Sequence, residues 1–295
     1  MKKNSKSDKL CIIVLCAPAI LHLLIFWLGT QLETFRMMFT DYLTGEASLE
    51  NFRWAIDELF AGASTSNIAL AFQNTMKFFV MSCALVPVTM FFAYLLFRKC
   101  IGGSFSRLAL YLPGAVSGIT MSLLYAKLME STGPLMQLIQ NIAGLEEPII
   151  IRASHGVAYV MIYDILVGVG ANLIIWLGGM NRIPYDLIEY GKLEGVGPFR
   201  EFVSVILPLI WPTFVTMITL QIIGMFGATG SILVLTNGEF GTNTLAFWMY
   251  KMVQENLVDE YNHVAALGMI FTIISIPIVV LGRKFMNRFG EEVEY

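Results

Sequence analysis

One carboxylate lies in the middle of an apolar run that is long enough to cross a bilayer. Asp164 stands within residues 155–179, next to Tyr163. A charge at the centre of a membrane is costly, so such a residue usually faces water, a partner or a transport path. Two interpretations stay open: Asp164 serves transport, or it is hydrogen-bonded to tyrosine or backbone in a packed interior.

A second apolar run, residues 213–235, is rich in small and polar side chains. A helix that faced lipid all round would not need the amide of Gln221. Amide and hydroxyl groups on an inward face can bind the hydroxyls of a sugar, or they can form hydrogen bonds between helices. We favour the first interpretation, with these candidates for a translocation path: Tyr163, Asp164, Gln221, Thr229 and Ser231.

The side chains that carry most enzyme chemistry are scattered. His22, His155 and His263 are far apart, and the four cysteines lack metal-ligand spacing. No GxxxxGK[ST] stretch is present to hold the phosphates of ATP. With a net charge of −3 and no basic stripe, nucleic-acid binding is not indicated either. We therefore expect no catalytic residues, no metal and no cofactor.

Composition places the chain in a membrane. It is 56% hydrophobic and only 14% charged, whereas soluble domains carry about 25% charged residues. Runs of about 20 apolar residues predict membrane-spanning helices. We expect an all-α polytopic protein whose single transmembrane domain covers 1–295, with spans near 11–31, 76–97, 108–128, 155–179, 213–235 and 264–282. In the third span, Gly114 and Gly118 form a small-xxx-small pair that predicts close helix packing.

The basic residues predict an orientation. If the N-terminus is inside, 13 of the 19 Lys and Arg residues fall on the inner side of the six spans. Cytoplasmic loops carry such an excess because cationic segments resist translocation. Both termini are therefore expected in the cytoplasm, together with the polar segment between the fourth and fifth spans.

That polar segment, residues 181–212, predicts two short helices joined by an elbow. Pro184 suits the start of a helix that ends near Leu193, and Gly195 suits a left-handed residue after it. A second helix is expected from about Phe199 towards Leu207 and Pro208. A helix–elbow–helix on the cytoplasmic side is a shape that can insert into a soluble partner.

The same segment resembles the cytoplasmic coupling loop of binding-protein-dependent ABC importer permeases. That loop reads Glu-Ala-Ala, two residues, Asp-Gly-Ala, then Phe and a closing Ile-x-Leu-Pro. The matching positions here are Glu189, Tyr190-Gly191, Glu194-Gly195-Val196, Phe202, Val205, Leu207 and Pro208. Gly191 departs from the alanine pair and should weaken the first helix by up to about 1 kcal/mol.

A second resemblance narrows the family to carbohydrate permeases of the maltose and glycerol-phosphate type. It rests on a Phe-Thr-Asp-Tyr stretch, an Asn-Phe pair and an Asn-Thr pair: Phe39 to Tyr42, Asn51-Phe52 and Asn74-Thr75. In that family the permease lies in the bacterial inner membrane and performs no catalysis itself. The resemblance implies a second related permease subunit, a cytoplasmic ATPase dimer, an extracytoplasmic substrate-binding protein and a small-molecule substrate.

From the resemblance we expect the permease subunit of an ATP-driven sugar or oligosaccharide importer. The residues expected to couple it to the ATPase are Pro184, Glu189, Glu194, Gly195, Phe199, Leu207 and Pro208. The alternative is a secondary transporter driven by an ion gradient, with Asp164 as the ion site. An intramembrane enzyme is a more distant possibility, because Asp164 has no second aspartate or nucleophile beside it in the apolar runs.

Overall fold

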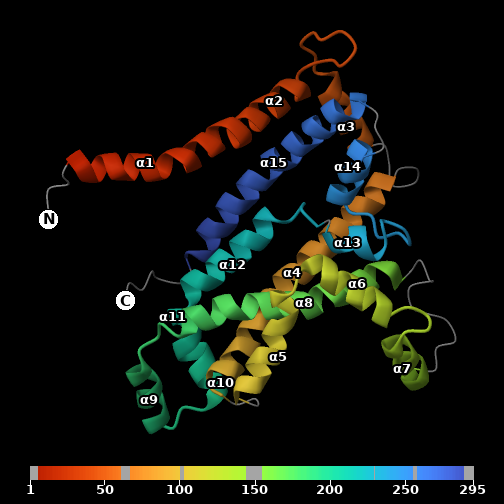
Figure 1. The fold of residues 1–295 in the computed structure, drawn as a ribbon. Coiled ribbons are helices and arrows are strands. Elements are labelled where there is room, and N and C mark those ends of the chain that lie inside the picture. Colours follow the sequence, from red (N-terminus) through yellow and green to blue (C-terminus); the bar gives the residue numbers. More distant parts are fainter. Residues whose placement is uncertain are drawn as a thin grey trace. The chain divides into compact units, whose positions relative to one another are not determined.

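The computed structural model describes residues 6–60, 67–99, 103–143, 155–228, 230–254 and 258–288. Within these ranges the regular elements are helices, apart from one isolated bridge between Thr40 and Ala47 (Figure 1). The all-helical expectation is therefore confirmed. The chain divides into two compact units: Met1–Ala61 with Lys251–Thr272, and Gly62–Tyr250 with Ile273–Tyr295.

The first unit is built from helices of two separate parts of the chain. Its elements are α1 (Lys6–His22), η1 (Leu23–Leu28), α2 (Gly29–Met38), α3 (Glu50–Phe60) and the first part of α15 (Val258–Met286). A small core forms around Met38, Ala265 and Ala266. The Thr40 carbonyl accepts hydrogen bonds from the amides of Asn51 at 3.0 Å and Asn262 at 2.7 Å. Asn51 thus fixes the turn after α2.

The second unit contains the helices that position the candidate site. They are α4 (Asn67–Phe97), α5 (Gly103–Ala115), α6 (Gly118–Leu128), α7 (Pro134–Ala143), α8 (Gly156–Met180), α9 (Tyr185–Leu193), α10 (Pro198–Glu201), η4 (Phe202–Ile206), α11 (Leu207–Leu209), α12 (Trp211–Ile223), α13 (Gly230–Leu235) and most of α14 (Leu245–Gln254).

Four of the described helices are long and apolar enough to cross a membrane. They are Ile13–Met38, Ile68–Phe97, Gly156–Met180 and Glu260–Met286, and each overlaps a predicted span. Two further pairs of helices qualify only if each bent pair counts as one span. The described residues therefore hold four to six candidate spans, against the six continuous ones expected.

The third predicted span, 108–128, is not one continuous helix. It breaks into Leu108–Ala115 and Gly118–Leu128, whose axes differ by 107°. Ser117 at the break has an extended backbone (ψ 132°) and begins α6. Pro113 and the two glycines on either side of the break are the weakest helix formers, and they explain why the apolar run does not stay straight.

The fifth predicted span, 213–235, is also interrupted. Helix α12 ends at Ile223, residues 224–228 are not helical, and α13 begins at Gly230. Three glycines in seven residues, Gly224, Gly227 and Gly230, lower the helix propensity here. At its other end α12 follows a bend of 75° after Leu209. The apolar length of the run predicted a span, but its glycines shorten the helix.

Helices α4, α5 and α8 pack closely in the second unit. The indole Nε1 of Trp176 donates to Oγ1 of Thr89 at 3.1 Å, and both residues are fully buried. A Cβ at Gly114 would lie 2.9 Å from the backbone nitrogen of Ala171, and one at Gly170 would overlap the Leu110 carbonyl. Gly114 thus has the packing role expected of it, whereas a Cβ at Gly118 would meet nothing within 4 Å.

The Asn-Thr pair before the second span anchors a distant loop. Asn74 donates from Nδ2 to the carbonyls of Gly241 and Asn243, at 2.7 and 2.8 Å. The Thr75 hydroxyl accepts the backbone N–H of Leu245 at 3.0 Å. These motif residues hold the chain between α13 and α14 against α4.

Candidate functional site

A pocket of about 400 Å³ opens in the second unit between α4, α8, α12 and the interrupted segment after α12. Its polar lining consists of hydroxyls, amides and a single carboxylate: Ser82, Asp164, Asn172, Gln221 and Ser231. The rest of the wall is apolar or glycine: Phe78, Met81, Leu85, Gly168, Gly224, Gly227, Ala228 and Gly230. Pockets for small ligands are commonly about 300–1,000 Å³ with a few polar groups.

Helix α8 contributes one face to the pocket. Asp164, Gly168 and Asn172 follow one another at intervals of four residues and therefore lie on one stripe of the helix. The Ser231 hydroxyl donates to Oδ2 of Asp164 at 3.2 Å. This bond links α8 to the start of α13. Asp164 therefore lines the pocket while one of its carboxylate oxygens accepts a hydrogen bond.

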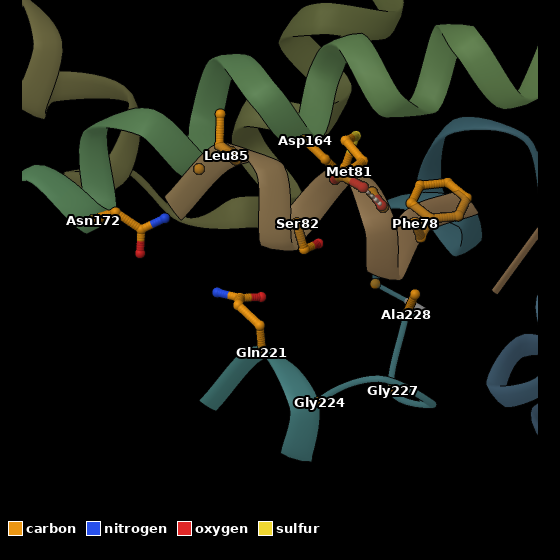
Figure 2. A pocket seen from close by; sticks show the side chains of 13 residues that line it. Phe78, Met81, Ser82, Leu85, Asp164, Asn172, Gln221, Gly224, Gly227 and Ala228 are labelled. Atoms are coloured by element: carbon orange, nitrogen blue, oxygen red, sulfur yellow. Dashed lines mark hydrogen bonds between the residues drawn. The ribbon is translucent and has the colours of Figure 1, made fainter. Parts of the chain in front are cut away.

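The opposite wall comes from α12 and the turns that follow it. Figure 2 shows Gln221 projecting from α12 into the space below Ser82 and Leu85 of α4, with Asn172 projecting from α8. Gly224 and Gly227 bring non-helical backbone to the same wall. Such backbone is tolerated at membrane depth where it is buried in protein or lines a cavity.

The structure brings together three of the five residues predicted for the path. Asp164, Gln221 and Ser231 line the pocket, although Ser231 is 67 positions from its partner Asp164. Tyr163 lies elsewhere: its hydroxyl donates to the Gly118 carbonyl at 3.0 Å, and its ring is buried in a core with Tyr125 and Tyr159. Thr229 lies outside the described residues.

Two polar lining residues were missed by sequence reasoning. Asn172 follows Asp164 by two helical turns, and this spacing could have predicted a shared face. Ser82 belongs to α4, which no polar pattern singled out. Its place in the pocket comes from the packing of α4 beside α8 and α12.

The polar segment after α8 has the predicted helix–elbow–helix form. Helix α9 runs from Tyr185 to Leu193 and continues through Gly191. Gly195 follows with φ +70°, and the N–H of Val196 donates to the Gly191 carbonyl at 3.0 Å. This is the bonding of a Schellman motif, in which a left-handed residue ends the helix. Only glycine adopts that backbone without strain.

Helix α9 has two different apolar faces. Ile188 is buried in the core cluster of the second unit together with Ile183, and this contact holds the helix in place. Leu187, Tyr190 and Leu193 are exposed, the last at 84%. Exposed apolar groups that gather on one element often mark a contact surface for a partner.

Most of the predicted coupling residues are exposed as well. Pro184, Glu189, Glu194, Gly195, Phe199 and Pro208 are exposed, whereas Leu207 is half-buried. After α10 the chain continues through η4 and α11 to the bend before α12 (Figure 1). The segment thus connects the exposed face of α9 with α12, which lines the pocket.

The pocket has the chemistry of a binding site. Among the described residues, no group of three or more His, Cys, Asp or Glu side chains is placed to hold a metal ion. Hydroxyls and amides both donate and accept hydrogen bonds, as does every sugar hydroxyl. The single carboxylate adds a strong acceptor.

The chain is similar to known proteins over most of its length. The profile of a family described as "Binding-protein-dependent transport system inner membrane component" matches residues 10–293. The chain is similar to the arabinooligosaccharides transport system permease protein AraP of Bacillus subtilis, with 24% identity over 94% of this chain and 88% of that protein.

Two further similarities concern a Streptococcus protein and a solved structure. The multiple sugar-binding transport system permease protein MsmF of Streptococcus mutans is 25% identical over 65% of this chain and 66% of that protein. A crystal structure of a bacterial alginate ABC transporter, in complex with an alginate pentasaccharide-bound periplasmic protein, superposes with a TM-score of 0.80. It is 18% identical and covers 97% of this chain and 96% of the other.

Proposed function

The chain belongs to the family of binding-protein-dependent transport system inner membrane components, and on this premise we propose that it forms the path for a sugar or oligosaccharide. Family membership makes it a multi-pass permease subunit of an ABC importer, with ATP hydrolysed by a partner chain. The ion-gradient-driven alternative is set aside, because this family works with binding proteins.

The observation that carries the proposal is the polar lining of the pocket. Asn172, Gln221 and Ser82 face one space from three helices, and Asp164 adds a carboxylate. Amides and carboxylates can each bond two neighbouring hydroxyls. The names of the relatives AraP and MsmF point to the same substrate class.

The coupling segment supplies the second part of the proposal. We infer that α9 and the elbow at Gly195 seat on a cytoplasmic ATPase dimer, and that ATP-driven closure of that dimer switches the pocket between outward-open and inward-open states. A conformational change of this kind needs a ligand that binds the two states differently. The exposed face of α9 suits such a contact.

The remaining parts of the proposal concern topology and partners. The excess of Lys and Arg on one side of the spans supports cytoplasmic N- and C-termini. We propose that residues 1–295 act as one transmembrane domain beside a second related permease subunit. An extracytoplasmic binding protein would deliver the substrate, and the alginate transporter's complex with a periplasmic protein is consistent with this.

Reconstitution tests the proposal. The chain is co-expressed with its neighbouring transport subunits and placed in proteoliposomes, and uptake of labelled neutral oligosaccharides is measured with ATP inside. We expect uptake that needs ATP and the binding protein, and that a dissipated ion gradient leaves unchanged. Uptake that survives removal of the ATPase but is abolished by Asp164→Asn would overturn the proposal in favour of the ion-driven mechanism.

A further inference from the structure

A buried carboxylate joins the segment after the elbow to the end of α4. Glu201 ends α10, and its side chain has no exposed surface. Its Oε1 accepts the Tyr94 hydroxyl at 3.1 Å and lies 3.6 Å from Nε of Arg98. The Tyr94 hydroxyl is also 2.8 Å from the Pro198 carbonyl oxygen. Both ends of α10 are thereby tied to the last turn of α4.

This network buries charge, and burying charge costs free energy that stabilisation of the fold alone does not explain. The second carboxylate oxygen, Oε2 of Glu201, is buried and has no hydrogen-bond partner within the part of the chain that the structure describes. Replacing a buried ion pair by well-packed apolar side chains is often neutral or stabilising. A buried charge that is only partly satisfied is therefore poorly explained by stability, whereas it does fix one geometry of α10 on α4.

Apolar packing reinforces the same contact. The ring of Phe202, the residue after Glu201, lies 5.0 Å from the ring of Tyr94 and 5.4 Å from that of Phe91, centroid to centroid. Phe202 and Tyr94 both belong to the buried core cluster. The contact of α10 and the start of η4 with the end of α4 thus combines charge, hydrogen bonds and aromatic packing.

Helix α4 also carries part of the pocket wall. Ser82 and Leu85 line the pocket about three turns before Tyr94 in the same unbroken helix. Thr89, between them, is bonded to Trp176 of α8, so α8 is held to α4 as well. If α4 follows a displacement of α10, the α4 and α8 walls of the pocket are therefore displaced as well.

We propose that Glu201 is a positioning residue that locks α10 to α4, so that movement of α9 and the elbow carries the α4 and α8 walls of the pocket with it. The inference rests on the proposed coupling function and adds the route by which force reaches the pocket. Without the lock, α10 can pivot on α4 and the movement of the elbow is lost before it reaches the pocket.

Glu201→Gln tests the lock, because glutamine keeps the size of the side chain and removes its charge. Spin labels are placed on exposed positions of α4 and α12, at Val88 and Leu220, in the complex with its ATPase subunits. The distance between the labels is measured without nucleotide and after trapping with ATP and vanadate. We expect the native complex to change distance, and the variant to bind ATP but populate the switched state at least about threefold less.

The control is Glu130→Gln, which removes the charge of an exposed pair with Lys127 at 3.1 Å and should switch like the native complex. A merely structural role of Glu201 would lower the yield of complex but leave the distance change of assembled complexes intact. That result would overturn the proposal.

Tyr94→Phe is the second variant, in case Glu201→Gln does not assemble. It removes the hydroxyl that contacts both the Glu201 carboxylate and the Pro198 carbonyl, and leaves every charge in place. A reduced switched population supports the lock, and a native one overturns it. If the native complex itself shows no ATP-dependent change, the proposed coupling function fails, and the inference fails with it.

Discussion

At the scale of single residues, the elbow depends on one backbone angle. Gly195 has φ +70°, and a Cβ at this position would meet nothing within 4 Å, so the constraint on the residue is conformational and not steric. Glu194 before it is exposed and donates its N–H to the Tyr190 carbonyl. The relative direction of α9 and α10 therefore rests on a residue that can adopt the left-handed region.

Gly195→Pro should abolish ATP-coupled uptake while the protein still inserts into the membrane. Proline fixes φ near −65°, so the elbow must take another path and α9 loses its docking direction. The measurement is uptake and membrane abundance in the same vesicles. Gly191→Ala is the control, since it lies inside α9 with free space around it. Normal ATP-dependent uptake by the proline variant would contradict the coupling role of the elbow.

A second residue-scale prediction concerns the pocket. Gln221→Leu should raise the KM for uptake about five- to fifteenfold, because one lost hydrogen bond is worth about 1–1.5 kcal/mol. Leu220→Met is its control, because Leu220 is adjacent but exposed and absent from the pocket lining. Equal KM values for the two variants and the native protein would remove Gln221 from the path.

At the scale of elements, two helices touch without side chains between them. Gly170 of α8 faces the Leu110 carbonyl of α5, and Gly114 of α5 faces the backbone of Ala171. Close approach of this kind is how membrane helices gain packing in the absence of a hydrophobic driving force. It places α8, with Asp164 and Asn172, at a fixed distance from α5.

Gly170→Ala should separate these helices and destabilise the protein by about 1–3 kcal/mol, the usual cost of overpacking. Thermal unfolding in detergent measures the loss as a lower Tm. The matched control is Gly178→Ala in the same helix, where nothing lies within 4 Å. There alanine should leave the Tm unchanged or raise it slightly, because alanine favours helix by up to about 1 kcal/mol. Equal behaviour of both variants would contradict the close packing.

At the scale of the whole molecule, the proposal depends on which side of the membrane the elbow occupies. The positive residues favour the cytoplasm for α9 and both termini. The proposed ATPase would work on that side, so an elbow on the outer side could not be driven by it.

Labelling of single cysteines with a membrane-impermeant reagent measures this directly, after Cys11, Cys16, Cys83 and Cys100 are replaced by serine. Leu193→Cys, at an exposed position of α9, should react only in permeabilised cells. Leu43→Cys, in the exposed turn after α2, should react in intact cells. Reaction of Leu193→Cys from outside would overturn the coupling mechanism.

The sequence alone determined the class, the helix–elbow–helix form of the segment after α8 and part of the pocket lining. Apolar runs of span length need no tertiary information, because the bilayer sets their length. The elbow was predictable because proline and glycine act on their own backbone: α9 begins one residue after Pro184, and Gly195 has positive φ. Asp164 and Gln221 were predictable because a polar group within a membrane-spanning run is costly unless it faces water or a polar partner.

Only the tertiary structure decided how the spans break and which residues meet. Hydropathy averages over a run, so it missed the 107° bend after Ala115 and the end of α12 at Ile223. Tyr163 was predicted to line the path because it is adjacent to Asp164 in the sequence. Adjacent residues on a helix point in different directions, and Tyr163 lies in the core. Glu201 meets Arg98, far away in the sequence, because α10 packs against the end of α4. Long-range contacts of this kind depend on helix packing, which no local pattern encodes.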